Sequence, residues 1–125
     1  MMNPQYAIYN APLSNWSYAA ATAGILNTTV AVPIKTAAGA GVRNAITAIQ
    51  IMSDALTAAT ELAIRDGAGG AVLWRTKIGT TGLPVETVVL STPIIGSANT
   101  LLEVVTLTAS VAGAVYVNAQ GFTCV

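Results

Sequence analysis

The sequence has no histidine and a single cysteine, Cys124. Without histidine, the commonest general base at neutral pH and the commonest metal ligand are both missing, so histidine-based catalytic triads are excluded. A structural zinc site is excluded as well, because it needs four ligands from cysteine or histidine and the chain has a single cysteine and no histidine. Cys124 has no second cysteine with which to form an internal disulfide, which is compatible with a reducing cytosol. We interpret it as an ordinary thiol in a terminal strand.

Charged residues are also scarce. They make up 8% of the chain, against roughly 25% in soluble globular proteins. Five Lys and Arg balance five Asp and Glu, so the chain has neither a basic field for nucleic acid nor an acidic field for cations. A compact monomer of this size exposes roughly 6,200 Å² of surface. We expect neutral polar residues to cover part of it and contacts with other subunits to bury another part.

Long apolar runs are absent too. No window reaches about eighteen uninterrupted apolar residues, and residues 1–6 lack the positive charge and apolar run of a signal peptide. We therefore expect a chain that neither spans a membrane nor is exported through Sec. The length of 125 residues is that of one ordinary domain.

What the sequence has in abundance is β-branched residues. Val, Ile and Thr supply 39 of the 125 residues, and these types fit a pleated, half-buried surface better than a helix. Recurring Gly and Pro residues cut the chain into short segments. Short segments between turns predict an all-β sandwich or barrel.

The clearest local signal is a β-hairpin formed by residues 60–66 and 71–77. Alternation places Leu62 and Ile64 on one face of the first strand. The glycine-rich residues 67–70 supply the positive φ angles of a tight reversal. A phosphate-binding loop at these glycines is disfavoured because such a loop is followed by a helix, whereas a strand follows here.

The same signals predict further strands, for a total of seven or eight, at residues 27–36, 45–52, 86–92, 101–108 and 113–119. A helix over residues 44–64, capped by Asn44, is the alternative for one stretch. Its apolar stripe would consist of Ile46, Ile49, Met52, Leu56 and Leu62. Residues 53–54 interrupt this stripe, and the alternation of residues 49–51 favours a strand.

Four of the seven aromatic residues lie within the first 24 residues. They are the candidate interface residues Tyr6, Tyr9, Trp16 and Tyr18. Because they follow no clear period, we interpret residues 1–24 as an extended N-terminal arm and residues 25–125 as the sandwich domain. Two alternatives stay open: a first strand packed on its own sheet, or an arm laid over a neighbouring subunit, where Tyr and Trp are enriched.

The remaining candidates for chemistry are one tryptophan and five carboxylates. Trp74 could anchor a sugar or a protein, but its place within the hairpin favours the core. A glycosidase-like pair needs only two carboxylates, and the chain has Asp54, Glu61, Asp66, Glu86 and Glu103. They are more simply solvated strand or turn residues, and none belongs to a calcium-loop pattern. We expect that the chain is not an enzyme and that it has no catalytic residue, no bound metal and no cofactor.

Four segments carry a family resemblance in their order and spacing. Residues 59–67 (ATELAIRDG) lead into residues 72–75 (VLWR), and residues 96–101 (GSANTL) precede residues 115–122 (VYVNAQGF). From Ile46 to the end the chain resembles small virion proteins of tailed bacteriophages. Residues 1–40 have no counterpart in that pattern.

The resemblance implies a compact antiparallel β-sandwich, jelly-roll-like, that works by assembly. The first implied role is a capsid cement or decoration protein, which binds the outer capsid surface and ties major capsid subunits together. The partners would be the major capsid protein and copies of the chain itself, with a trimer favoured, and neither nucleic acid nor membrane. The protein would be made in the host cytoplasm and reside on the capsid surface. A tail or fibre component, or a carbohydrate- or receptor-binding module, is the alternative.

Overall fold

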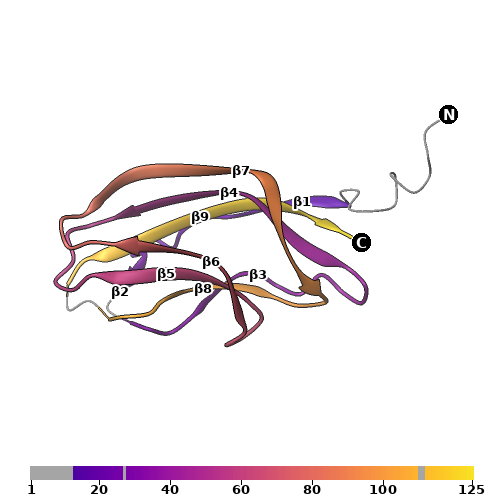
Figure 1. The fold of residues 1–125 in the computed structure, drawn as a ribbon, viewed down its shortest axis with the longest axis horizontal. Coiled ribbons are helices and arrows are strands. Elements are labelled where there is room, and N and C mark those ends of the chain that lie inside the picture. Colours follow the sequence, from indigo (N-terminus) through magenta and orange to yellow (C-terminus); the bar gives the residue numbers. More distant parts are fainter. Residues whose placement is uncertain (1–12, 27, 110–111) are drawn as a thin grey trace.

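The computed structural model describes residues 13–26, 28–109 and 112–125 and is an antiparallel β-sandwich (Figure 1). This described part of the chain contains nine strands. They are β1 (Ser14–Tyr18), β2 (Ile25–Leu26), β3 (Val32–Lys35), β4 (Arg43–Ser53), β5 (Thr60–Asp66), β6 (Ala71–Ile78), β7 (Leu83–Ala98), β8 (Leu102–Thr106) and β9 (Ala114–Cys124). No helix long and apolar enough to cross a membrane occurs among these residues.

The strands form two sheets. Sheet A has the order β1-β9-β4-β7, with β2 also paired to β9, and sheet B has the order β3-β8-β5-β6. All the strand pairs are antiparallel. In Figure 1 the strands β1, β4 and β9 and the first part of β7 lie above β3, β5, β6 and β8, as two layers, and the end of β7 descends toward sheet B. The predicted fold class, an all-β antiparallel sandwich, is confirmed.

The pairing pattern is that of a jelly roll. The strands at the start, β1 and β2, pair with β9 at the end; β3 pairs with β8, β4 with β7 and β5 with β6. Such nested pairs arise when one long antiparallel hairpin is rolled into two sheets. The pairs β4-β9 and β5-β8 then join successive turns of the roll.

The core lies between the central strands of the two sheets. Fully buried aliphatic side chains from β4, β5 and β8 meet there, including Ile46, Ile49, Leu62, Ile64 and Val104. Burying one such side chain stabilises the fold by about 1.5–3 kcal/mol. Because the core-facing residues of β5 alternate, the residues between them form the outer surface of sheet B.

The helix hypothesis for residues 44–64 is wrong, because β4 and β5 occupy this stretch. A β-bulge explains the misleading pattern. In the pairing with β9, Ile46 lies opposite Gly121 and Ala48 opposite Gln120, so Thr47 is an extra residue. The bulge lets Ile46 and Ile49, three residues apart, face the same core, and a spacing of three resembles one face of a helix.

The β5-β6 hairpin is confirmed, and its turn has the predicted glycine conformation. Gly67 and Gly69 have φ angles of +91° and +66°, values that residues with a Cβ atom rarely adopt. The register shifts between Ile64 and Arg65, which marks a bulge near the turn.

The strands β7 and β9 extend furthest beyond their predicted ends. β7 runs through Pro84 and Pro93, and proline is tolerated there because β7 is an edge strand of sheet A with one unpaired side. β9 continues through Gly121 to Cys124, which is buried. Gly121 is therefore not a turn residue but a point of close approach between strands.

Part of the predicted N-terminal arm belongs to the sandwich. Ser14–Tyr18 forms β1 and pairs with β9 over five positions, from Ser14 opposite Thr123 to Tyr18 opposite Ala119. The boundary predicted at residues 24 and 25 therefore does not separate an arm from the sheet. Residues 1–12 lie outside the described residues.

Candidate assembly surface

The outer surface of sheet A is a broad face that the core does not use. Strand pairing places its side chains in rows, because residues that pair across a sheet point to the same side. We define the neutral face as the outward-facing residues Asn15, Ser17, Ala48, Gln50, Met52, Thr87, Val89, Ile95, Tyr116, Asn118, Gln120 and Phe122.

None of the residues of the neutral face is charged. Only two charged residues occur on the strands of sheet A, Arg43 and Glu86. Arg43, the first residue of β4, pairs with Cys124 and therefore lies at the end of this same side of the sheet, next to Phe122. It is exposed, and its Nη1 donates to the carbonyl of Gly96 at 3.1 Å. Glu86 pairs with Ile51, a core residue, so it lies on the opposite side of β7 from Thr87 and the neutral face.

The middle of the neutral face is hollow. A shallow depression of about 250 Å³ lies over the central strands, and its lining includes Ser17, Ala48, Gln50, Thr87, Asn118 and Gln120. Ala48 has the shortest side chain among these residues. The others are uncharged groups that donate and accept hydrogen bonds.

A chain of amide contacts crosses this hollow from strand to strand. Gln50 donates from Nε2 to Oγ1 of Thr87 at 3.3 Å, and Asn118 donates from Nδ2 to Oε1 of Gln50 at 3.4 Å. Oδ1 of Asn118 accepts from the backbone N–H of Ala20 at 2.9 Å. The two contacts that involve Gln50 are long and solvent-exposed, so this amide is available to a partner.

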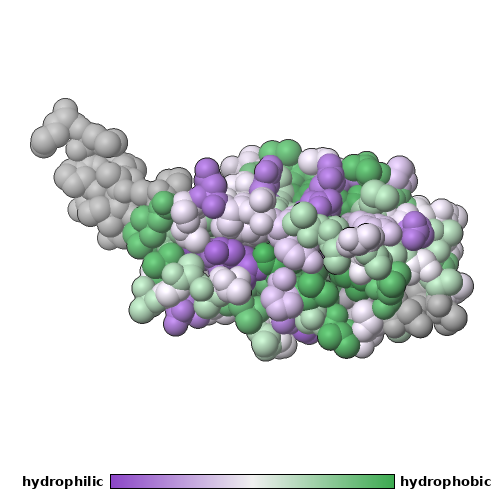
Figure 2. All heavy atoms as spheres, turned by 180° about the vertical axis from the view of Figure 1, so that it is seen from behind, coloured by the Kyte–Doolittle hydropathy of each residue, from purple (hydrophilic) through white to green (hydrophobic). Residues whose placement is uncertain are grey.

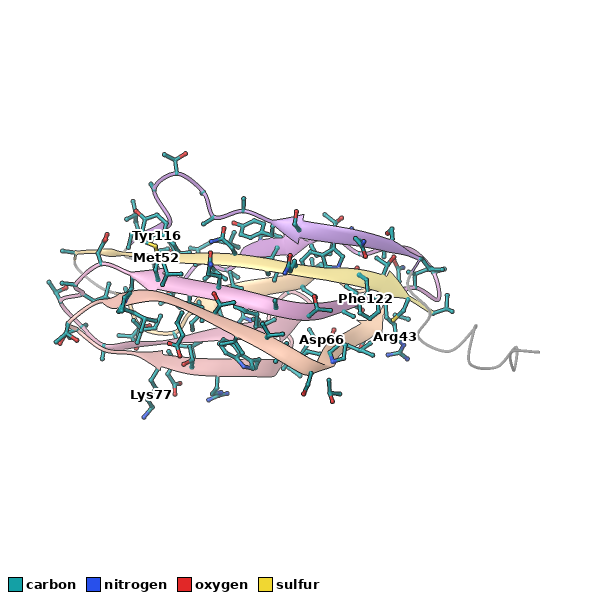
Figure 3. All side chains as sticks on the ribbon, turned by 90° about the horizontal axis from the view of Figure 1, so that it is seen from above. Arg43, Met52, Asp66, Lys77, Tyr116 and Phe122 are labelled. Carbon is teal, nitrogen blue, oxygen red and sulfur yellow. The ribbon has the colours of Figure 1, made fainter. Side chains whose placement is uncertain are left out.

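Apolar side chains flank the hollow. Met52 and Tyr116 pair at one end of the face, and Phe122 lies toward the other end, near Arg43 (Figure 3). At the β7 edge Val89 is 76% exposed. Figure 2 shows hydrophobic and hydrophilic residues interspersed over the side of the molecule seen from behind. On the neutral face itself, exposed apolar side chains such as Val89 lie beside exposed uncharged polar ones such as Thr87.

The outer surface of sheet B has the opposite character. Alternation and pairing place five charged residues on it, which we call the charged face: Glu61, Arg65, Arg75, Lys77 and Glu103. Lys77 projects away from the sandwich (Figure 3). Glu61 and Arg75 form an exposed ion pair with a separation of 3.7 Å. Half of the ten formal charges of the chain thus lie on one side of the sandwich.

One ion pair on the charged face is almost buried. Glu103 is 4% exposed, and its Oε2 accepts from Nε of Arg65 at 2.7 Å and from the backbone N–H of Gly69 at 3.1 Å. Nη2 of Arg65 also contacts this oxygen. The contacts join β5, β8 and the hairpin turn, so the pair is a structural link.

The other carboxylates are spread over the molecule. Asp66 accepts from the backbone N–H and the hydroxyl of Ser97 at 2.9 and 2.5 Å. Asp54 accepts from the backbone N–H of Ala114 at 3.2 Å. Groups of three or more metal-ligating side chains are not found within the ranges that the structure describes.

The four candidate interface residues fall into two groups. Tyr6 and Tyr9 lie outside the described residues. Trp16 and Tyr18 are half-buried on β1 and pack against the core, and Nε1 of Trp16 donates to the carbonyl of Phe122 at 3.2 Å. This is the arrangement of a first strand packed on its own sheet. A role for these residues in an interface stays a prediction.

Trp74 is also half-buried and packs against the core, as predicted. The residues of the neutral face were not singled out from the sequence. Their signal was present in part, since Tyr116, Asn118, Gln120 and Phe122 alternate with smaller residues along β9. That they share one face with residues of β4 and β7 depends on long-range pairing.

Comparison with known proteins does not identify a family for this chain. No family model matches the chain, and no curated protein matches it. Among solved structures, a Tobacco streak virus coat protein is similar with a TM-score of 0.43 and 8% identity, over 91% of this chain and 88% of that one. A structure of the coat protein dimer of the same virus gives 0.41 and 7%, over the same shares. The fold assignment depends on the strand pairing described above and not on these likenesses.

Proposed function

We propose that this chain is a structural protein of a virion, a cement or decoration protein on the capsid of a tailed bacteriophage. It binds the outer capsid surface and stabilises contacts between major capsid subunits. The observation that carries the proposal is the unequal charge of the two faces of the jelly roll. The segments that resemble small virion proteins of tailed bacteriophages support it independently.

A chargeless face of this size is unusual for a surface that only contacts water. Interface cores are depleted in charged residues and enriched in aromatic residues and Met. The neutral face has both properties, with Met52, Tyr116 and Phe122 on it and no charge. Jelly rolls are common in viral capsids, although a fold alone does not fix a function.

The proposed partners are the major capsid protein and further copies of this chain, with a trimer as the favoured oligomer. Neither nucleic acid nor membrane is a proposed partner, because the formal charge is zero and two of the cations on the charged face, Arg65 and Arg75, pair with carboxylates of this chain. The proposed location is the capsid surface, after synthesis in the host cytoplasm.

We also propose that the chain is not an enzyme. Four of the five carboxylates have a structural contact: Glu103 with Arg65, Glu61 with Arg75, Asp66 with Ser97 and Asp54 with Ala114. General acid–base pairs in glycosidases instead face each other across a substrate cleft.

A second candidate function is a carbohydrate- or receptor-binding module. The hollow of the neutral face favours it, because uncharged amides and hydroxyls are suited to hydrogen bonding with a neutral sugar. Titration with neutral glycans distinguishes the two functions. The cement proposal predicts that glycans at millimolar concentration cause no change in the chemical shifts of the Gln50 and Asn118 amides.

Co-sedimentation tests the cement proposal. Purified chain is mixed with shells of the major capsid protein of the encoding virus, before and after shell expansion, and with purified tails as the control. We expect saturable binding to expanded shells, in a fixed ratio to the shell subunits, and none to tails. Binding to tails alone would instead support the tail or fibre alternative.

A further inference from the structure

Resting on the proposed function, we propose that the chain docks on the shell through the neutral face of sheet A and presents the charged face of sheet B to solution. We further propose that the hollow of the neutral face receives a convex, uncharged protrusion of a shell subunit. Three observations carry this orientation: the distribution of charge, the size of the face and its shape.

The distribution of charge favours the neutral face for burial. An ion that loses its water without gaining a partner is strongly destabilising. On the charged face Lys77 and the ion pair of Arg75 with Glu61 are exposed, so a partner covering that face would have to supply a carboxylate for Lys77 and remove water from the ion pair. The residues of the neutral face carry no charge, and the exposed cation Arg43 lies at the end of the face, where the rim of an interface stays in contact with water. The free energy of desolvation is therefore lowest when an uncharged partner surface covers sheet A.

The size of the neutral face suits a specific interface. β4 and β9 have 11 residues each, which corresponds to a length of about 36 Å at 3.3 Å per residue. β1, with 5 residues, covers about half of this length, so the four strands at about 4.8 Å spacing give an average width of roughly 17 Å. The product, roughly 600 Å², is of the same order as the approximately 800 Å² per partner that standard stable interfaces bury.

The shape of the face favours a different partner over a second copy. In a two-fold dimer the same patch meets itself. In a dimer whose two-fold axis passes through the hollow at Ala48 and Gln50, the hollow would oppose an identical hollow, and the contact would leave an unfilled space at its centre. Well-packed interfaces have few such voids. A protruding loop of a shell subunit fills the hollow, and Gln50 and Asn118 can hydrogen-bond to its backbone.

The chain offers a matched pair of variants for the test. Val89 on β7 and Val72 on β6 are both exposed valines on edge strands, at 76% and 38% exposure. Val89 pairs with Ala48 and lies on the neutral face, whereas Val72 pairs with Arg65 and lies on the charged face. Val89→Lys and Val72→Lys therefore introduce the same charge on opposite sides of the sandwich. Gln50→Lys adds a charge within the hollow.

The experiment measures the affinity of each variant for expanded shells, with thermal unfolding to show that each one folds. We expect Val89→Lys and Gln50→Lys to weaken binding at least about tenfold, which corresponds to about 1.4 kcal/mol. Val72→Lys should bind within about twofold of the unaltered chain.

The possible outcomes separate the orientation from the proposed function. Normal binding of Val89→Lys and Gln50→Lys, or weakening by Val72→Lys alone, would overturn the orientation while the cement function stands. A solution dimer that Val89→Lys dissociates would assign the neutral face to a second copy and overturn it as well. If the unaltered chain binds no shells, the proposed function fails and the orientation fails with it.

Discussion

Replacing Glu103 with Ala lowers the free energy of unfolding by about 3 kcal/mol, because it leaves Arg65 without its partner in a largely buried position. The side chains of Arg65 and Glu103 are 22% and 5% exposed. Glu103 also accepts from the backbone N–H of Gly69, so the substitution removes a contact to the hairpin turn as well. Chemical denaturation followed by tryptophan fluorescence measures the loss.

The matched control for Glu103→Ala is Glu61→Ala, which breaks the ion pair with Arg75. Both residues of that pair are more exposed, at 32% and 55% of the side chain, and the separation is 3.7 Å. Exposed pairs contribute about 0–1 kcal/mol. Equal losses for the two variants would show that burial does not distinguish the two pairs, and the structural role assigned to Glu103 would be wrong.

Gly121→Ala has the second large effect, since β9 has no space for a side chain at this position. A Cβ atom there would lie 1.8 Å from the backbone oxygen of Ala45 and 3.0 Å from Cζ2 of Trp16. Because the first atom belongs to the backbone of β4, the central strands of sheet A would have to separate. We expect a loss of about 4 kcal/mol or more, a large part of the roughly 5–15 kcal/mol that stabilises an ordinary domain.

Gly79→Ala is the control for Gly121→Ala. Gly79 follows β6, has no positive φ angle, and a Cβ atom there would meet nothing within 4 Å. We expect its melting temperature to stay within about 4 °C of the unaltered chain, because such changes alter stability by less than about 1 kcal/mol. A soluble Gly121→Ala protein with the same melting temperature would contradict the close approach of β4 and β9.

The sandwich could be predicted because its evidence is local. The β5-β6 hairpin depends on alternation at Leu62 and Ile64 and on glycines in the turn, all within a few residues. The ends of β7 could not be predicted from local signals. Pro84 and Pro93 ordinarily end a strand, and they are tolerated only because the tertiary structure places β7 at an edge.

The neutral face could not be predicted from the sequence either, because it also depends on the tertiary structure. Gln50, Thr87 and Asn118 come from three strands that are far apart in the chain, and only the jelly-roll register brings them into one row. The aromatic residues that the sequence did suggest, Trp16 and Tyr18, pack against the core. An aromatic residue near a terminus has the same signature in the sequence whether it covers its own sheet or a neighbour.

The number of copies per particle tests the central claim most directly. Purified virions of the encoding virus are digested, and the molar ratio of this chain to the major capsid protein is measured by quantitative mass spectrometry. A cement protein at contacts between capsid subunits predicts a fixed ratio between about one to one and one to three, whereas a tail component would give only a few copies. Absence of the chain from purified particles would contradict a virion role altogether.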